Sequence, residues 1–235
     1  MIRVASYNIR KSVGQDWRRD PDRVLEVLAE IDADIVALQE VDRRFGSSRA
    51  SSLSPHAIDE QTPYKPVIFG IRPESLGWHG NAILVRKNFE VGRHCRIELP
   101  CLEPRGAVLA DIAAEGRTLR VVAMHLGLMK HWRQRQARAL LDYLESLEEG
   151  MPTVMLGDLN EWSTTGGCFE QFARHHHVVD PGPSFHAKRP FVSLDRIITS
   201  PHLQTEAAGV HISPKARIAS DHLPVWARLR FEPAA

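Results

Sequence analysis

Residues 153–160 read TVMLGDLN, an apolar run followed at once by a glycine, an aspartate and an asparagine. A short continuous apolar run is typical of a strand buried on both faces. The same pattern recurs where RVASY precedes Asn8, where DIVALQ precedes Glu40 and where LRVVAM precedes His125. Each predicted strand therefore stops at a polar residue, which is where α/β sheets place their ligand sites.

One predicted helix lies between the first two of these strands, and another lies between the last two. Asp20 and Pro21 are typical of a helix start, and apolar residues continue with helical spacing to Ile31. A second helix is predicted over 130–147, between His125 and Asp158. Two strand–helix–strand units of similar length indicate an α/β fold. The alternative is coincidence, because Asn and Asp often end strands as turn formers.

The remaining sequence fits one domain over residues 1–235, because strands and helices alternate without a linker. Residues 42–63 are rich in Ser and Arg and lack periodicity, so they predict a long loop. The run His175–His177 predicts a polar loop rather than a metal site, since consecutive side chains do not share one face. Further strands are predicted at 67–69, 82–85, 108–112, 193–198 and 225–231.

The composition is that of a globular protein, with 235 residues, 43% hydrophobic residues and a formal net charge of +1. The small net charge argues against a dedicated duplex-binding protein but allows a locally basic groove. Three cysteines without CxxC spacing predict free thiols in a reducing compartment. We expect a cytoplasmic protein, because the amino terminus is too polar for a signal peptide and no stretch approaches the ~18 apolar residues of a membrane helix. Nothing in the sequence predicts a protein partner or an integral membrane segment.

Each polar residue at a strand end also has a structural explanation. Asn8 and Asp158 can be turn residues, Glu40 a solvated strand end and His125 a core histidine. The triplet 220–222, Ser-Asp-His, can be a capping cluster. Their joint occurrence instead indicates phosphoester hydrolysis, which requires charge neutralisation, an oriented water and a stabilised leaving oxygen.

The residue types fit these three requirements. Glu40, Asn8 and Asp221 supply the hard oxygens that Mg²⁺, or alternatively Mn²⁺, prefers. If the chain is extended there, Asp158 and Asn160 point to one face, so that one accepts a proton from water and the other donates to a phosphoryl oxygen. His222 needs a carboxylate to fix its tautomer, and we expect Asp195 to form that His–Asp dyad. His125 is a second imidazole, suited to phosphate contact or leaving-group protonation.

Eight motifs, in this order along the chain, resemble those of the endonuclease/exonuclease/phosphatase superfamily. They are SYNIR, LQEVD, HGNAILV, PRGAVLADI, MHLG, GDLN, SLDRIITS and SDHLPV. The resemblance implies a four-layer α/β sandwich of two packed mixed sheets flanked by helices. It implies Glu40 as the principal metal ligand, a phosphate contact for Arg105 and a place near the site for Asn81. The base or donor role of His222 stays open.

The sequence leaves several functions open. A divalent-metal phosphodiesterase acting on nucleic acid or on a phospholipid-like diester is one, a monoesterase for a sugar or inositol phosphate is another, and a non-catalytic phosphate-binding module is a third. A nuclease predicts a basic groove around residues 43–49 and 130–138. A lipid-directed enzyme predicts an apolar rim, for which Trp17, Trp78 and Phe45 are candidates, and a monoesterase predicts a closed pocket.

Lys130, His131, Arg133, Arg135 and Arg138 crowd the start of the second predicted helix, where the helix dipole disfavours cations. An anionic substrate group is one compensating partner. The alternative is a solvated face above a core stripe of Trp132, Leu140 and Leu144.

Overall fold

The computed structural model describes residues 1–42, 50–69, 75–147 and 150–233. Its strands are β1 (Ile2–Asn8), β2 (Ile35–Gln39), β3 (Tyr64–Pro66), β4 (Ala82–Arg86), β5 (Glu90–Glu98), β6 (Gly106–Ala114), β7 (Arg117–His125), β8 (Thr153–Asp158), β9 (His177–Val179), β10 (Asp195–Thr199), β11 (Leu203–Val210) and β12 (Val225–Phe231). Its helices are η1 (Arg10–Ser12), α1 (Pro21–Ile31), α2 (Pro55–Gln61), α3 (Lys130–Glu145), α4 (Phe169–Phe172) and α5 (Ala216–Ala219).

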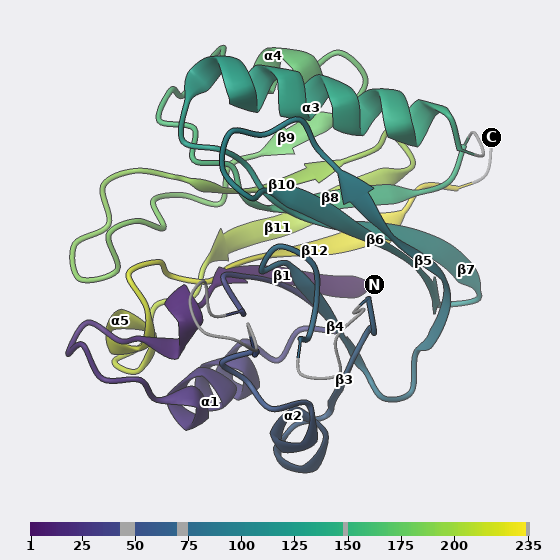
Figure 1. Cartoon of the computed structure of the whole chain (residues 1–235). Helices are drawn as coiled ribbons and strands as arrows, with labels where there is room; N and C mark the ends of the chain where they lie inside the picture. The colour runs from purple at the N-terminus through teal and green to yellow at the C-terminus, as the bar shows by residue number, and fades with distance from the viewer. Residues whose placement is uncertain (43–49, 70–74, 148–149, 234–235) are drawn as a thin grey trace.

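The strands form two six-stranded mixed sheets, in the orders β11-β12-β1-β2-β4-β3 and β5-β6-β7-β8-β10-β9. The sheets pack face to face, with α1, α2 and α5 below one and α3 and α4 above the other (Figure 1). An apolar layer that includes Val4, Ile83, Val121 and Ile197 fills the space between the sheets, and two further layers lie under the helices. The expected four-layer α/β sandwich is confirmed.

The two predicted strand–helix–strand units are present, one in each sheet. β1 pairs in parallel with β2, with Asn8 opposite Gln39, and β7 pairs in parallel with β8, with His125 opposite Asp158. In parallel strands the carboxyl ends meet at one edge. The polar residues at these ends are therefore brought to the same rim in both sheets.

The helix α1 begins as expected. Asp20 caps it by accepting a hydrogen bond from the Arg23 backbone N–H, Pro21 occupies the first turn, and the apolar face from Val24 to Ile31 is buried. The predicted loop over 42–63 was wrong in its second half, because Ser54 and Pro55 start the short helix α2. The strand predicted at 67–69 lies earlier, at β3, although Val67 and Phe69 are still buried.

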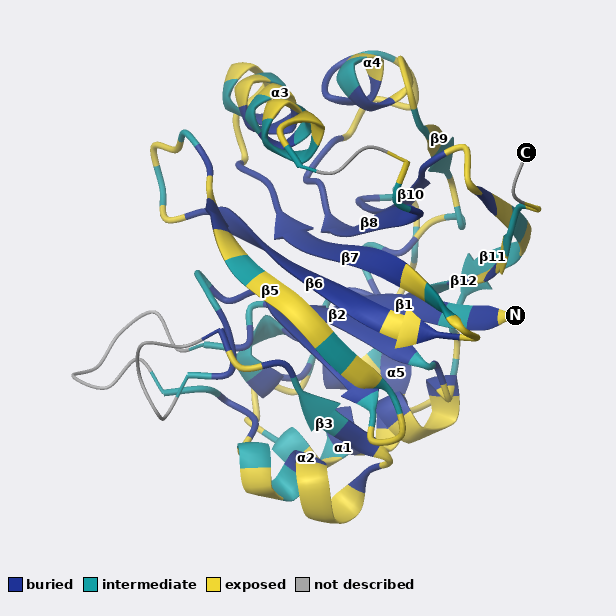
Figure 2. Cartoon of the chain, turned by 90° about the vertical axis from the view of Figure 1, so that its right-hand side faces the viewer, coloured by how far each residue is buried: buried dark blue, intermediate teal, exposed yellow. Residues whose placement is uncertain are grey.

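Three strands were missed. β5 and β9 lie at the two edges of one sheet and β11 lies at an edge of the other. The edge strand β5 is largely exposed (Figure 2), and the exposed residues of the three strands are mostly polar. Edge strands are half solvated, so their sequences lack the continuous apolar run that identified the central strands. Among the described residues no helix is both long and apolar enough to cross a bilayer, and all three cysteines are free thiols, as expected.

Candidate active site

Three residues of the second sheet share one register at its rim. His125 ends β7, Asp158 ends β8 and Asp195 begins β10, which runs antiparallel to β8. Asp158 is thus paired with His125 on one side and with Asp195 on the other. All three are buried, with Asp195 at 0% exposure. The sheet therefore aligns an imidazole and two carboxylates without any contribution from loops.

The expected His–Asp pair is present. His222 Nδ1 lies 2.9 Å from Asp195 Oδ2, and the Ser184 hydroxyl donates to the same oxygen at 2.5 Å. This contact places the proton of the neutral ring on Nδ1 and leaves Nε2 facing Asp158 Oδ2 at 3.6 Å. Burial lowers the pKa of His222, but the charges of Asp195 and Asp158 outweigh it and raise the pKa to about 10.

Asp158 is the point at which the site residues meet. Its Oδ2 accepts a hydrogen bond from Asn8 Nδ2 at 3.0 Å and lies 3.4 Å from His125 Nε2. Its Oδ1 accepts the backbone N–H of Asn160 at 2.9 Å. Burial raises the pKa of Asp158 to about 6, against the opposing charge of His222. A carboxylate with this pKa is ionised at neutral pH and is more basic than a solvated one.

Asn160 does not have the geometry that the sequence suggested. Its φ is 51°, in the left-handed region, so the chain is not extended between Asp158 and Asn160. Its Nδ2 donates to the Leu126 carbonyl at 3.0 Å. The expectation of two side chains on one face was wrong, because the strand ends at Asp158 and the backbone turns there. Asn160 still lies at the site, linked to the strand end that carries His125.

Arg105 and Asn81 both lie near the rim. Arg105, 6% exposed, places Nη1 2.9 Å from both ring nitrogens of His125. Asn81 Nδ2 donates to the carbonyl of Gly106 at 2.9 Å, and Gly106, which directly follows Arg105, is the first residue of β6 and the strand partner of His125. Asn81 therefore holds the backbone residue that pairs with His125, so it lies near the site as expected.

The three predicted metal ligands lie where the ends of β1 and β2 and the loop before β12 meet. Glu40 follows Gln39, the partner of Asn8, and forms an ion pair with Lys11. Asp221 lies 3.5 Å from Arg10 Nε, and the neighbouring Ser220 hydroxyl donates to the Asn8 carbonyl at 2.7 Å. Glu40 and His222 are therefore at the same rim: Glu40 directly follows the strand partner of Asn8, and the Ser220 hydroxyl links the His222 backbone N–H to the Asn8 carbonyl.

A second group of possible metal ligands is more compact. Ligand atoms of Asp158, Asp195 and His222 lie within 4.8 Å of one another, and all three residues are buried. This cluster could hold a metal ion, although His222 and Asp195 already hydrogen-bond to each other.

The cation-rich start of α3 is partly explained by a protein carboxylate. Arg133 is 5% exposed and pairs with Glu161 through Nη2 at 3.1 Å and Nε at 3.2 Å. The buried face of α3 consists of Arg133, Gln136, Ala137 and Leu140, whereas Trp132 and Leu144 are only partly buried. Leu144 nevertheless packs against the core beside Leu140, so the predicted core stripe was wrong only for Trp132.

Sequence reasoning also missed residues that orient the site. Ser184 holds Asp195, Ser220 holds the end of β1, and Glu161 holds Arg133. Ser184 carried no usable signal, because a serine in a polar loop is ordinary. Ser220 belonged to the Ser-Asp-His triplet, but no role of its own was predicted for it. Glu161 directly follows the GDLN motif, and its partner Arg133 belongs to the cation-rich start of the second predicted helix. Of these contacts, the ion pair between Glu161 and Arg133 is therefore the one that could have been inferred from the sequence.

Exposed apolar side chains lie on the segments next to the site residues. Trp17 stacks with Arg10, Leu128 lies three residues beyond His125, and Trp162 lies two beyond Asn160. Phe191 contacts Phe185, whose ring centroid is 5.0 Å from that of His222.

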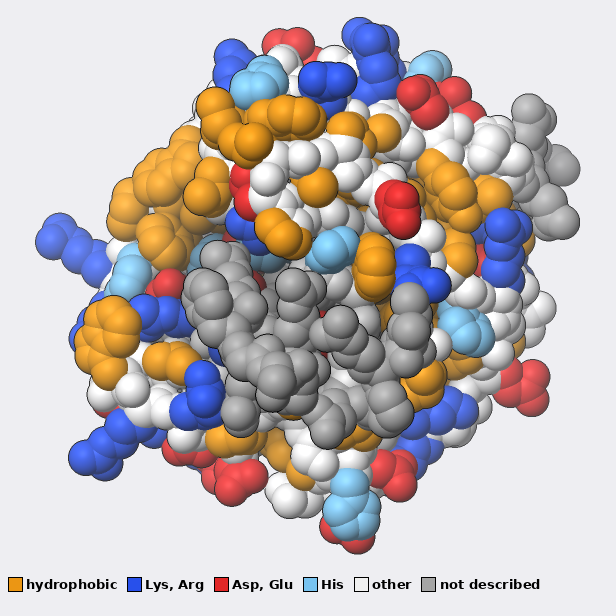
Figure 3. Space-filling model, in the orientation of Figure 1, with side chains coloured by type: hydrophobic (Ala, Val, Ile, Leu, Met, Phe, Trp, Pro, Cys, Tyr) orange, Lys and Arg blue, Asp and Glu red, His pale blue; other side chains and the backbone are white. Residues whose placement is uncertain are grey.

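Hydrophobic side chains gather at the upper left of the surface, near the left end of α3 and the long loops around β9 and β10 (Figures 1 and 3). Leu102, Leu128 and Phe191 are each more than 60% exposed.

Of the three rim candidates from the sequence, Trp17 is 78% exposed. Trp78 is only partly buried but lies under Arg96 and beside Gly106, not at an open surface. Phe45 and the basic segment 43–49 lie outside the described residues.

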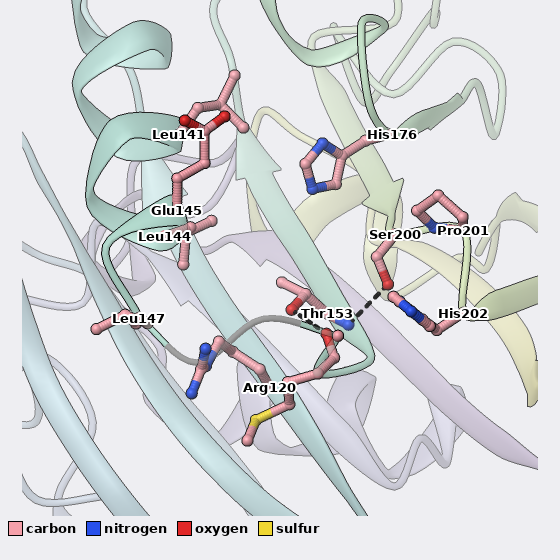
Figure 4. A pocket seen from close by; sticks show the side chains of 12 residues that line it. Arg120, Leu141, Leu144, Glu145, Leu147, Thr153, His176, Ser200, Pro201 and His202 are labelled. Carbon is pink, nitrogen blue, oxygen red and sulfur yellow. Dashed lines mark hydrogen bonds between the residues drawn. The ribbon is translucent and has the colours of Figure 1, made fainter. Parts of the chain in front are cut away.

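A separate pocket lies at the opposite end of the second sheet (Figure 4). Its volume is about 210 Å³, and it is lined by the second half of α3, the start of β8 and the β10–β11 turn, including Leu144, Thr153, His176 and Ser200. None of the candidate site residues lines it, so it is not the phosphoester site. His175 and His176 lie in turns and His177 begins β9, so the expected polar loop is confirmed only for the first two.

Comparisons with known proteins agree with the geometry. The sequence model of the Endonuclease/Exonuclease/phosphatase family matches residues 5–222. The uncharacterized protein YbhP of Escherichia coli K12 is 27% identical over 253 aligned residues, covering 98% of this chain and 96% of YbhP.

Two solved structures share the fold. An endonuclease/exonuclease/phosphatase from Bacteroides vulgatus has a TM-score of 0.79 at 19% identity and covers 98% of this chain and 99% of its own. The Bacteroides thetaiotaomicron mannosyl-6-phosphatase Bt3783 has a TM-score of 0.76 at 19% identity, covering 98% and 100%.

Proposed function

Since the chain belongs to the endonuclease/exonuclease/phosphatase family and is a phosphoesterase, we propose that it is a Mg²⁺-dependent hydrolase of phosphodiester bonds. The observation that carries this proposal is the buried contact of Asp158 with Asn8, His125 and His222 at one rim. A non-catalytic module has no need for a buried carboxylate whose pKa is raised beside a His–Asp pair.

The residues at the rim fit a magnesium-type ion. Glu40, Asp221 and the Asn8 amide would hold it through hard oxygens, and the partial exposure of the Glu40 and Asp221 side chains (18% and 25%) leaves room for water ligands. When bound, the ion neutralises charge on the phosphoryl group and stabilises the leaving oxygen. Mn²⁺ fits the same donor set.

The remaining catalytic roles fall to side chains of the protein. Asp158 orients the attacking water and takes its proton as the water oxygen bonds to phosphorus and the ester P–O bond breaks. The pKa of about 10 keeps the His222 ring protonated on both nitrogens at neutral pH. Because Asp195 holds Nδ1–H, Nε2–H is directed toward the site, which favours the role of hydrogen-bond donor to the phosphoryl group over that of base. Arg105 and His125 offer positive charge and a donor on the other side of Asp158.

The apolar rim favours a phospholipid-like diester as the substrate. Trp17, Trp162 and Phe191 are aromatic and largely exposed beside the polar cluster. An enzyme that meets a lipid surface requires exposed apolar side chains next to its catalytic groups. A nucleic acid is the second candidate, because Lys130, Arg135 and Arg138 are exposed at the start of α3.

The test is a panel of phosphoesters with Mg²⁺, with Mn²⁺ and with EDTA. We expect metal-dependent turnover of bis-p-nitrophenyl phosphate that is abolished in Asp158→Ala and His222→Ala, and equal turnover in these variants would remove the enzyme proposal. Phospholipid vesicles, plasmid DNA and sugar phosphates then identify the substrate class. Faster turnover of vesicles than of the other substrates supports the lipid proposal. In that case the double variant Trp162→Ser, Phe191→Ser should lower turnover of vesicles more than turnover of the soluble diester. Preference for DNA or for a sugar monoester overturns the lipid proposal. A cytoplasmic location and a single-domain organisation are further proposals of ours.

A further inference from the structure

We propose that Arg133 and Glu161 are positioning residues, which fix the loop that follows His125 at the end of β7 to the loop that holds Asn160. The proposal rests on the proposed phosphoesterase function and assigns a role to a buried ion pair that the chemistry itself does not use. Arg133 lies in the first turns of α3, and Glu161 lies in the loop after β8.

Arg133 binds both loops at once. Its Nε and Nη2 hold the two carboxylate oxygens of Glu161, while Nη1 donates to the Leu128 carbonyl at 2.6 Å and lies 3.4 Å from that of Gly127. The planar guanidinium fixes the angle between its partners, so moving one loop strains the other. Gly127 and Leu128 lie two and three residues after His125, and Glu161 directly follows Asn160.

The loop after His125 is held from two further directions. Gln136 Oε1 accepts the Gly127 N–H at 2.8 Å, and Glu103 Oε1 accepts the Leu128 N–H at 3.0 Å. Glu103 also lies 3.7 Å from Arg105 Nε. The same network therefore joins Arg133 to the arginine that contacts His125.

Glu161 organises the second loop around itself. Its two oxygens also accept the backbone N–H groups of Ser163 and Cys168. Gly167, with φ +64°, has its missing Cβ position 2.2 Å from Glu161 Oε2, so only glycine allows the loop to wrap the carboxylate this closely. Burial alone would raise the pKa of Glu161, but the hydrogen bonds from Arg133 and from the Ser163 and Cys168 backbone N–H groups, together with the charge of Arg133, outweigh it and hold the pKa below its ordinary value.

The test replaces both charges, so that no lone charge stays buried. The variant is Arg133→Met with Glu161→Gln, and its matched control is Arg120→Met with Asp111→Asn. That control removes a pair with the same bidentate geometry, at 2.8 and 3.0 Å, across β6 and β7 and away from the site. The readouts are kcat and KM on bis-p-nitrophenyl phosphate, melting temperature, and amide hydrogen exchange over 126–128 and 160–168.

We expect kcat to fall on the order of 10²-fold in the Arg133/Glu161 variant with KM changed less than about threefold. Hydrogen exchange should accelerate about tenfold in both loops, and neither change should occur in the control. Arg133→Lys keeps the positive charge but loses the bidentate guanidinium geometry, so its kcat should lie between that of the double variant and that of the wild type. Exchange and kcat equal to those of the control would overturn the proposal. If the wild type cleaves no phosphoester, the proposed function fails, and hydrogen exchange alone decides the loop positioning.

Discussion

Asn8, the last residue of β1, donates its Nδ2–H to Oδ2 of Asp158, the last residue of β8, across 3.0 Å. β1 and β8 belong to different sheets, so this hydrogen bond joins the two halves of the sandwich at the site. Asn8 Oδ1 meanwhile accepts the Arg10 backbone N–H, which orients the amide. The position of Asp158 therefore depends on how the two sheets pack.

Asn8→Ala should lower kcat about 10- to 100-fold, because Asp158 loses a neighbour that orients it and the site loses one oxygen ligand. Steady-state kinetics with Mg²⁺ titration would measure both effects. Ser6→Ala is the matched control, since Ser6 lies on the same strand and loses a buried hydrogen bond to Gln39 without touching Asp158. A kcat in Asn8→Ala equal to that of Ser6→Ala would contradict this prediction.

Ser184→Ala should reduce both stability and activity. It removes the hydroxyl that donates to Asp195 Oδ2 inside the protein, which costs about 1–2 kcal/mol in the free energy of unfolding. It also leaves Asp195 freer to rotate, so kcat should fall about tenfold. Urea unfolding and kinetics check the two effects, and Ser184→Thr, which keeps the hydroxyl, should restore the kcat.

Gly157→Ala should destabilise the protein by about 1–3 kcal/mol. A Cβ at this position would lie 1.8 Å from the Met124 carbonyl oxygen, so β7 and β8 must separate just before His125 and Asp158. Thermal unfolding would measure the loss. Gly92→Ala should change little, since its Cβ would make only an ordinary contact at 3.5 Å, and equal melting temperatures for the two variants would be inconsistent with this packing.

The Arg133–Glu161 pair should make stability depend on acid pH. The folded-state pKa of Glu161 is lowered below the ordinary value of 4.5. Its stabilisation is therefore fully present above the unfolded-state pKa and is lost as the pH falls through the folded-state pKa. The difference in unfolding free energy between the wild type and the Arg133→Met, Glu161→Gln variant should be constant above about pH 5. Below that pH, the wild type should lose unfolding free energy relative to the variant. A difference that does not change with pH would disprove the assignment.

Two of the three thiols, Cys101 and Cys168, should react very differently with iodoacetamide. Burial raises the pKa of Cys168 to about 12, and the residue is fully enclosed, whereas Cys101 is exposed. Mass spectrometry at pH 8 should find Cys101 modified quickly and Cys168 modified only after unfolding. Labelling of Cys168 at the rate of Cys101 in folded protein would show that the loop around Glu161 opens readily.

The central strands were predictable because they are buried on both faces, and burial of both faces demands continuous apolar sequence. β7 and β8 are of this kind, and the polar residues that end them lie at the rim as expected. The edge strand β5 was not predictable, since only one of its faces packs and its sequence mixes Arg, His and Glu. The turn at Asn160 was also beyond sequence patterning, because a left-handed φ at Asn depends on where the strand pairing stops.

Local sequence by itself determined where strands end and which polar residues stand at those ends, because strand burial and helix capping are decided by neighbours along the chain. Only the tertiary structure decided which of these residues touch. Asn8 meets Asp158, and Ser184 meets Asp195, through the packing of two sheets and the path of a long loop. Contacts between residues far apart in the chain depend on the whole core, and no local pattern encodes them.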